Sequence, residues 1–273
     1  MASVGANERE LKDVAERVAA EAAEVVLEAW QGMQAGREVR VDTKSGETDV
    51  VTAVDHESER LIRARLAELR PGDGFIGEEG GGEAAAGGVT WVVDPIDGTV
   101  NFLYGLPWFA VSVAAQVDGE SVAGAVVEPV SGRRWTAARG EGSWLDGRRL
   151  AVSAPERLEV TLVATGFAYN AERRVRQARF AAELLGHVRD IRRPGSGALD
   201  LCAVGAGWVD ASVEHGLSRW DWAAGALIAA EAGAVVSISG ADRALGADAT
   251  FAAAPSIAGP LRDALIASGA ADV

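Results

Sequence analysis

Two aspartates three positions apart follow a short apolar run in the first half of the chain. The run Trp91–Val93 ends at Asp94, and Pro95 then prevents a simple continuation of strand pairing. Asp97 comes next, followed by the turn residues Gly98-Thr99. Divalent cations such as Mg²⁺ bind carboxylate and carbonyl oxygens, and phosphates bind backbone N–H groups and cations. This one segment therefore offers ligands for both.

Three further acidic positions lie at the ends of predicted elements: Asp55, the pair Glu78-Glu79, and Asp221. Each of them alone is typical of a solvated surface charge or a helix cap. Asp94 is different because it ends an apolar strand, where a carboxylate must be hydrogen-bonded or bound to a cation. We therefore interpret Asp94 and Asp97 as the centre of a functional site.

The elements that position these residues follow from hydrophobic periodicity and turn signals. The first half predicts two helices and then an antiparallel meander joined by Asp-Gly turns, with the Gly- and Ala-rich tract 80–88 as a flexible loop. The second half alternates strands with helices, which indicates an α/β lobe packed on an α+β lobe. The pattern changes near residue 153, so we expect lobes at 1–153 and 154–273. The predicted helices span residues 8–31, 55–69, 171–185, 196–205, 221–232 and 260–268.

Composition excludes several function classes. The formal net charge of the 273 residues is -14 and no Lys/Arg cluster stands out, which argues against a nucleic-acid partner. No uncharged apolar run is long enough to span a bilayer and the N-terminus lacks an apolar signal core, so we expect a cytoplasmic protein without a membrane partner.

Cysteine and histidine offer little chemistry here. Cys202, the single cysteine, lies in an apolar run and is predicted to be a core residue. The three histidines, His56, His187 and His215, have no metal-binding spacing, which argues against zinc. His215 is interpreted as an exposed loop residue, with ligand contact as the alternative.

Three motifs together resemble the inositol monophosphatase family of Mg²⁺-dependent phosphatases. They are Gly77-Glu78-Glu79, then Asp94–Thr99 followed by Asn101-Phe102, and finally Trp220-Asp221 with Ala223–Gly225 and Glu231–Gly233 behind it. Their order and separations match the family from about residue 10 to the C-terminus. The resemblance implies a layered αβαβα sandwich of the α+β kind. Its N-terminal sheet is antiparallel and carries a helix pair, and its C-terminal lobe is smaller with a mixed sheet.

The resemblance also implies a ligand set for two or three Mg²⁺ ions. Glu78, Asp94 and the main-chain carbonyl of Ile96 would bind the first ion, with Asp94 bridging to the second. Asp97 and Asp221 would complete the second site, and Glu78 would face a third ion through water. Lys44 matches a basic residue near the metals or is an ordinary surface lysine, and Glu79 is a candidate outer-shell residue.

Catalytic and substrate roles follow from the same resemblance. Thr99 and Asp55 would orient and deprotonate the attacking water, with Glu78 as the third catalytic residue. Gly98 and Thr99 would donate backbone N–H groups to the phosphate, and Glu214 would accept hydrogen bonds from ring hydroxyls. Arg192 and Arg193 either bind a second phosphate or pair with acidic neighbours. The other expected substrate-binding residues are Asp97, Gly195, Ser196, Gly197 and Asp221.

The expected reaction is hydrolysis of a small phosphate monoester by direct attack of water, with inositol monophosphate as the leading substrate. Histidinol phosphate, fructose 1,6-bisphosphate and 3′-phosphoadenosine 5′-phosphate are substrates of similar relatives, and the short chain weakens the last. Histidinol phosphate is the runner-up, and its cationic groups would require carboxylates that point away from the metals. By resemblance we also expect inhibition by Li⁺ and a homodimer. The alternative of another class is a non-catalytic metal-binding or regulatory protein.

Overall fold

The computed structural model describes the backbone of residues 7–46 and 49–273, and the side chains of residues 7–43 and 50–273. Lys44 therefore lies outside the described side chains. A small antiparallel pair of strands, β1 (Val41–Gly46) and β2 (Asp49–Thr52), connects the first two helices.

The N-terminal half forms an eight-stranded sheet with the order β10-β9-β8-β7-β6-β5-β3-β4. Its long buried central strand is β5 (Val89–Asp97). The helices α1 (Glu8–Gln34) and α2 (Ala53–Leu69) cover one face, and the six-residue helix α3 (Thr99–Tyr104) follows β5 directly. The remaining strands are β3 (Gly74–Gly77), β4 (Gly81–Glu83), β6 (Ala110–Val117), β7 (Glu120–Val127), β8 (Arg134–Ala138), β9 (Gly142–Leu145) and β10 (Arg148–Arg149).

The C-terminal half forms a five-stranded mixed sheet with the order β12-β11-β13-β15-β14. Its strands are β11 (Leu162–Thr165), β12 (Asp190–Arg192), β13 (Ala211–His215), β14 (Val235–Ser237) and β15 (Ala249–Ala253). Its helices are α4 (Ala171–Leu184), α5 (Gly197–Gly205), α6 (Arg219–Glu231) and α7 (Ala258–Ala267). Short 3₁₀ turns cover Leu158–Val160, Arg243–Leu245 and Ala270–Asp272.

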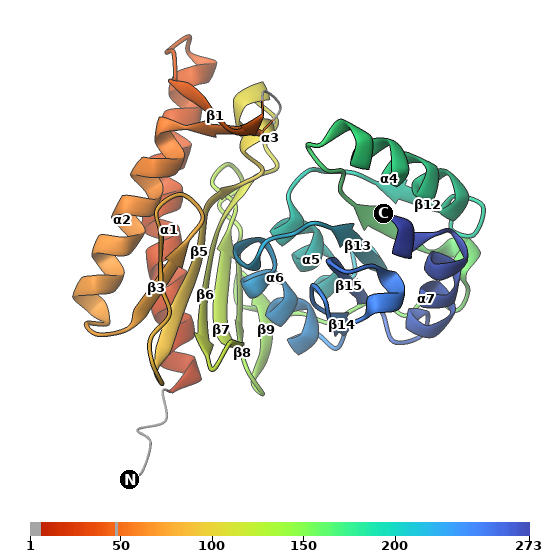
Figure 1. The fold of residues 1–273 in the computed structure, drawn as a ribbon. Helices are drawn as coiled ribbons and strands as arrows, with labels where there is room; N and C mark the ends of the chain where they lie inside the picture. Colours follow the sequence, from red (N-terminus) through yellow and green to blue (C-terminus); the bar gives the residue numbers. More distant parts are fainter. Residues whose placement is uncertain (1–6, 47–48) are drawn as a thin grey trace.

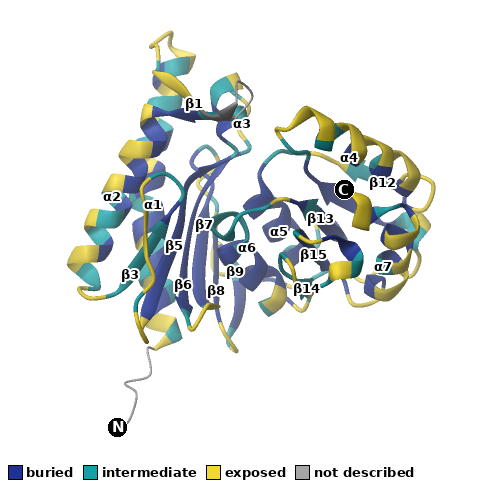
Figure 2. Ribbon diagram, viewed as in Figure 1, coloured by how far each residue is buried: buried dark blue, intermediate teal, exposed yellow. Residues whose placement is uncertain are grey.

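The elements stack in five layers (Figure 1). One apolar core lies between α1, α2 and the first sheet, and a second lies between that sheet and α5 and α6. The other side of α5 and α6 packs on the second sheet, whose far face is covered by α4 and α7. Burial follows the layers, with both sheets and the middle helices buried and the outer helices exposed on one side (Figure 2). The predicted αβαβα fold class is confirmed.

Three local expectations need correction. The first sheet is antiparallel apart from one pair, because β3 runs parallel to β5. The tract 80–88 contains β4, which pairs with β3, so it is partly ordered strand. The short helix α3 was not anticipated, since six residues are too few to show helical periodicity.

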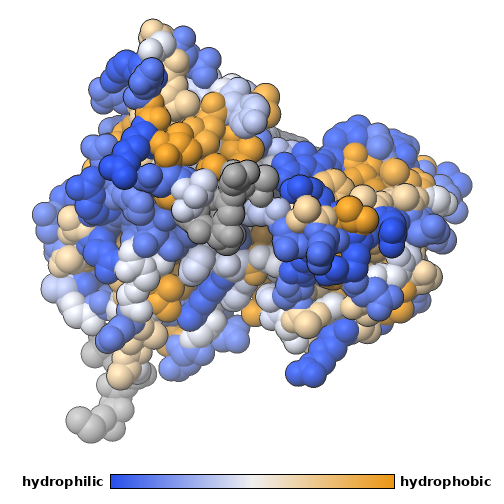
Figure 3. Space-filling model, turned by 45° about the horizontal axis from the view of Figure 1, so that its top comes forward, coloured by the Kyte–Doolittle hydropathy of each residue, from blue (hydrophilic) through white to orange (hydrophobic). Residues whose placement is uncertain are grey.

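The surface of the described chain is mostly polar, with some exposed apolar side chains. No helix in the described ranges combines the length and apolarity of a membrane span. On the face shown in Figure 3, apolar residues gather in the upper part and hydrophilic residues cover much of the remainder. The exposed large apolar residues include Val41, Tyr104 and Leu106.

Candidate active site

The strand β5 delivers Asp94 to the middle of the molecule. Successive residues of a strand point to opposite faces. Val93 belongs to the core under α1 and α2, and Val92 to the core against α5 and α6. Asp94 therefore shares the face of Val92 and points toward the middle helices. It is 2% exposed, and its Oδ1 accepts the N–H of Ile96 at 3.0 Å.

Asp221 reaches the same region from the first turn of α6. Its Oδ2 accepts the N–H of Ser218 at 2.7 Å, an N-terminal capping arrangement that holds the carboxylate at the start of the helix. The N-terminal end of a helix also favours a negative charge. The same contact thus begins α6 and fixes the direction of the Asp221 side chain.

Asp97 is held by the start of α5. Its Oδ2 accepts the hydroxyl of Ser196 at 2.5 Å and the N–H of Ala198 at 2.7 Å. Burial raises the pKa of Asp97 to about 6, against the lowering effect of these hydrogen bonds and of one from Gly197. The residues Ser196 and Gly197, expected to contact substrate, therefore position Asp97; Gly197 lines the cavity described below, whereas Ser196 is buried and does not.

These three aspartates form a cluster of like charges. One carboxylate oxygen from each lies within 4.8 Å of the others. Burial raises the pKa of Asp94 well above its usual range, and Glu78, Asp97 and Asp221 raise it further. Burial, Asp97 and Glu78 do the same to Asp221. Because buried carboxylates repel one another, the donor set fits a hard divalent cation that binds through oxygen.

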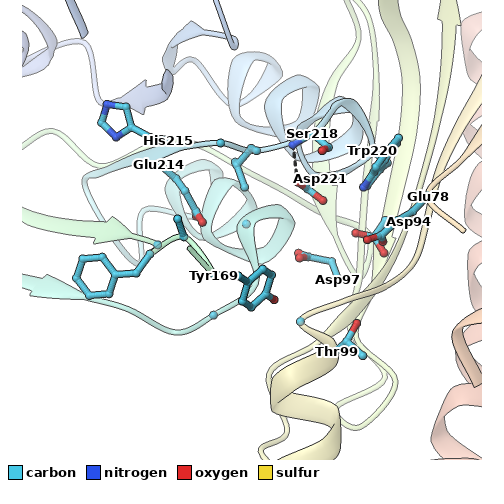
Figure 4. Close-up of a pocket in the computed structure, with 18 of the residues that line it drawn as sticks. Glu78, Asp94, Asp97, Thr99, Tyr169, Glu214, His215, Ser218, Trp220 and Asp221 are labelled. Atoms are coloured by element: carbon cyan, nitrogen blue, oxygen red, sulfur yellow. Dashed lines mark hydrogen bonds between the residues drawn. The ribbon is translucent and has the colours of Figure 1, made fainter. Parts of the chain in front are cut away.

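Glu78 joins the cluster through strand register. Gly77 on β3 is paired with Val93 on β5, and the N–H of Glu78 donates to the Val93 carbonyl at 3.2 Å. The next residue on each strand is therefore Glu78 beside Asp94. Figure 4 shows their carboxylates together, with Asp97 and Asp221 facing the same space. The four side chains come from the residue directly after β3, from β5 and from α6.

Thr99 and Asp55 form a buried pair at the edge of the cluster. The Thr99 hydroxyl lies 3.1 Å from Asp55 Oδ1 and 3.0 Å from the carbonyl of Ile96, both of which are acceptors. Asp55 is fully buried, and its Oδ2 accepts both the N–H and the hydroxyl of Thr52 at the start of α2. The capping contact of α2 thus aims Asp55 at Thr99.

The turn after Asp97 approaches the second half of the molecule closely. Gly98 has φ +93, and a Cβ on it would lie 3.1 Å from the carbonyl of Gly195. The Asn101 side chain donates to the carbonyls of Trp108 at 2.7 Å and Pro194 at 2.8 Å. Asn101 therefore joins the two halves beside the site. Asn101 belongs to the second sequence motif, but its role in joining the two halves depends on its contact with Pro194, 93 positions away in the chain.

A cavity of about 480 Å³ opens over the cluster. The predicted residues Gly98, Thr99, Gly195, Gly197 and Glu214 line it, together with the four acidic residues and Ile96. Burial raises the pKa of Glu214 to about 7; Asp97 adds to the rise and Arg193 opposes it. Sequence reasoning missed Tyr169 and Arg173, which also line the cavity. Figure 4 shows Tyr169 and Glu214 on the side of the cavity away from Glu78 and Asp94, which we call the opposite end.

The remaining predicted residues lie elsewhere or differ from expectation. Glu79 is not among the lining residues, and its N–H donates to Glu59. Cys202 is buried, as predicted. The interpretation of His215 as an exposed loop residue was wrong. It lies on β13, is buried, and its Nε2 is 2.7 Å from the carbonyl of Leu245. Arg192 pairs with Asp190 at 2.6 Å, whereas Arg193 lines the cavity.

Comparison with known proteins agrees with this geometry. The sequence pattern of the inositol monophosphatase family, which is metal-dependent, matches residues 7–269. The chain is 52% identical to the inositol-1-monophosphatase of Mycobacterium leprae over 276 residues, covering 95% of this chain and 93% of that protein. It is 40% identical to a Pseudomonas aeruginosa protein named Nus factor SuhB, covering 82% of this chain and 84% of that one. The structure of Mycobacterium tuberculosis SuhB superposes with a TM-score of 0.80 at 44% identity, covering 96% of this chain and 98% of that one. The chain therefore belongs to the inositol monophosphatase family of phosphatases.

Proposed function

We propose that this protein hydrolyses a small phosphate monoester, with inositol monophosphate as the leading substrate, in a reaction that requires Mg²⁺. The observation that carries the proposal is the convergence of three aspartates, two of them buried and Asp221 half-buried, within 4.8 Å at the base of an open cavity. The inositol-1-monophosphatase name of the relative that is 52% identical supports the choice of substrate.

Glu78, Asp94, the Ile96 carbonyl, Asp97 and Asp221 are the proposed ligands of two or three Mg²⁺ ions. Bound Mg²⁺ neutralises phosphoryl oxygens and makes the attacking water more acidic. The all-oxygen donor set suits Mg²⁺ better than softer metals. Li⁺ inhibition belongs to the same proposal, because a small monovalent ion competes for oxygen ligands of this kind.

Thr99 and Asp55 are the proposed pair that activates water. When the Thr99 hydroxyl donates to Asp55, its lone pairs are available to accept a hydrogen bond from a water on the cavity side. The water proton passes to Thr99 as the Thr99 proton passes to Asp55. The water oxygen forms a bond to phosphorus as the ester P–O bond breaks, so the configuration at phosphorus inverts. The leaving alcohol oxygen keeps the electron pair of that bond and takes a proton from solvent water, and Asp55 then returns its proton to solvent. The N–H groups of Gly98 and Thr99, in the unpaired first turn of α3, bind the phosphate.

The opposite end of the cavity selects the rest of the substrate. Glu214 accepts hydrogen bonds from vicinal ring hydroxyls, as a polyol requires. Arg173 and Arg193 also line the cavity, and the charge of Arg173 is paired with Asp248. The Arg193 guanidinium would attract the second phosphate of fructose 1,6-bisphosphate, and the Glu214 carboxylate would attract the cationic side chain of histidinol phosphate. These two phosphates are therefore the next substrates to test.

The test is phosphate release by the purified protein from inositol 1-phosphate, fructose 1,6-bisphosphate, histidinol phosphate and 3′-phosphoadenosine 5′-phosphate. Each substrate is assayed with Mg²⁺, with EDTA, and with Mg²⁺ plus Li⁺. Release from inositol 1-phosphate that EDTA abolishes supports the proposal. Absence of turnover on all four substrates contradicts it.

A second candidate function is a regulatory binding role without catalysis. It is favoured by the relative named Nus factor SuhB, which is 40% identical over most of both chains. The complete set of Thr99, Asp55 and four clustered carboxylates favours the enzyme. A folded protein that binds Mg²⁺ but releases no phosphate would favour the binding role.

The expectations of a homodimer and of a cytoplasmic location stay predictions. Tyr104, 82% exposed, and Leu106, 53% exposed, follow the site on α3 and the adjoining loop. Sedimentation of the wild-type protein beside Tyr104→Ser tests whether this surface joins two copies. A dimer that the substitution leaves intact would exclude Tyr104 from the interface.

A further inference from the structure

Glu59 lies one helical turn after Asp55 on α2 and is 4% exposed. Its Oε2 accepts the N–H of Glu79 at 2.8 Å, and its Oε1 accepts the N–H of Gly80 at 2.8 Å. Both oxygens therefore hold the turn that begins directly after Glu78. We propose that Glu59 is a positioning residue that fixes Glu78 for metal binding; this inference rests on the metal site of the proposed function.

The turn is shaped around the Glu59 carboxylate. A Cβ on Gly77 would lie 2.4 Å from Oε2, and a Cβ on Gly80 would lie 2.6 Å from Oε1. Such distances are sterically forbidden, so only glycine allows the carboxylate to enter the turn from this side. The glycines on both sides of Glu78-Glu79 are thus explained by a residue 18 positions upstream of the motif's first glycine.

Arg63 closes the same arrangement from the solvent side. Its Nη2 lies 3.4 Å from Glu59 Oε1 and donates to the carbonyl of Gly81 at 2.9 Å. Its guanidinium also lies over the ring of Phe75 on β3, 4.0 Å from the centroid. Two backbone N–H groups and one guanidinium therefore compensate the buried Glu59 charge.

The cluster needs such support because Glu78 is placed next to carboxylates of the same charge. Its own N–H is bound to Val93 on β5, and the two following N–H groups are bound to Glu59. The backbone is thereby fixed on both sides of the Glu78 side chain. The repulsion from Asp94 then cannot move the turn outward before a cation binds, so the site is preorganised.

The chain contains a matched control for this arrangement. Glu231, at the C-terminal end of α6, accepts the N–H groups of Gly140 at 2.7 Å and Gly142 at 2.8 Å. It holds the turn between β8 and β9 with the same chemistry, and none of these three residues lines the active-site cavity. If these hydrogen bonds matter only for the stability of each turn, their loss at Glu59 and their loss at Glu231 should have the same effect on Mg²⁺ affinity.

The experiment compares Glu59→Gln with Glu231→Gln in the full chain. Each change keeps the side-chain size but turns one acceptor into a donor that faces a backbone N–H. Isothermal titration with Mg²⁺ alone should show about tenfold weaker binding for Glu59→Gln, which corresponds to the loss of one charge-assisted hydrogen bond. Glu231→Gln should bind Mg²⁺ like the wild type. At saturating Mg²⁺, the KM for inositol 1-phosphate should be the same in all three proteins.

A second variant keeps the test valid if Glu59→Gln does not fold. Arg63→Gln removes only the solvent-side contacts and should weaken Mg²⁺ binding about threefold, in the same direction. Equal Mg²⁺ affinity for Glu59→Gln, or for Arg63→Gln in its place, and Glu231→Gln overturns the inference. A wild-type protein that binds Mg²⁺ yet hydrolyses none of the phosphates overturns the proposed function alone, because the Mg²⁺ titrations still decide the role of Glu59.

Discussion

The two ends of the active-site cavity differ in the charges they carry and in the contacts that hold their side chains. At the end formed by β5 and α6, the charges are all negative, and Asp94, Asp97 and Asp221 each accept a backbone N–H from a strand end or helix start. The opposite end carries charges of both signs, from Glu214, Arg173 and Arg193. Arg173 pairs with Asp248 at 2.6 Å, and its buried Nε has no acceptor among the described residues.

From this difference in charge we infer that the acidic end carries out the reaction and that the opposite end determines substrate preference. The acidic end is fixed by the same hydrogen bonds that begin α5 and α6, so its geometry cannot change without changing the fold. The opposite end depends on side chains of β13, of α4 and of the segment before α4, which can vary while the sheets stay intact. We therefore expect substitutions at the acidic end to remove activity and substitutions at the opposite end to alter preference or stability.

The largest effect is expected for Asp94→Asn at the acidic end. An amide keeps the shape but removes the charge shared among the proposed metal ligands, so kcat should fall by about 10⁴-fold, equivalent to several kcal/mol of transition-state stabilisation. Calorimetry should show weaker Mg²⁺ binding, and circular dichroism should show a folded chain. Activity within tenfold of the wild type would remove Asp94 from the metal site.

Thr99→Ala should give the next largest effect. Loss of the hydroxyl removes the proposed link between the attacking water and Asp55, and kcat should fall by about 10²- to 10³-fold. Mg²⁺ affinity should stay close to that of the wild type. Thr99→Ser is the matched control, because it keeps the hydroxyl and should recover most of the activity.

Glu214→Gln tests the opposite end through pH dependence. Burial raises the pKa of Glu214 from 4.5 to about 7, so the folded state binds a proton more tightly than the unfolded state. Its contribution to stability is therefore lost as the pH rises from about 4.5 to about 7. In Mg²⁺-free urea titrations the variant should match the wild type near pH 4. It should be more stable near pH 8, by on the order of 3 kcal/mol. A stability difference between the variant and the wild type that does not depend on pH would contradict this account. In the phosphatase assay, the KM of the variant should rise while its kcat changes little.

The smallest effect is expected at Asp200 on α5, which does not line the cavity. It is 1% exposed, and neither carboxylate oxygen has a hydrogen-bond partner among the described residues. Burial raises the pKa of Asp200 well above its usual range, with Glu214 and Asp97 adding to the rise. Asp200→Asn should therefore stabilise the protein at neutral pH by about 1 kcal/mol, without changing kcat/KM. An unchanged or lower melting temperature would contradict this expectation.

The sequence predicts the acidic end better than the opposite end, for a physical reason. Asp94 follows the apolar run Trp91–Val93, and Asp221 lies in the first turn of α6, so local motifs mark both. The expectation that the strand ends at Asp94 was wrong, because β5 continues through Pro95 to Asp97 with a register shift in its pairing with β6. Glu59 and Arg173 act through contacts with segments far away in the sequence, so no local pattern marks them. Asn101 belongs to a recognisable motif, but its hydrogen bond to Pro194 depends on a long-range contact. The interpretation of His215 as an exposed residue failed for a similar reason, since the histidine lies on β13, whose pairing with the distant strand β15 is a long-range contact.

The five layers themselves were predictable, but the direction of β3 was not. A short strand followed by a Gly-rich tract is consistent with either pairing direction, and only the long-range register with β5 makes it parallel. That register is what brings Glu78 beside Asp94. The site thus depends on one strand pairing for which the hydrophobic pattern gives no signal.

The position of α5 and α6 between the two sheets has a consequence for dissecting the molecule. Each sheet relies on these helices to cover one of its faces, although both helices follow residue 153 in the chain. A fragment ending near residue 153 would expose one apolar sheet face and lack Asp221. This fragment and a second one covering the remainder of the chain, produced separately and mixed, would regain hydrolysis only by reassembling. The chain would therefore be a candidate for a split-enzyme reporter.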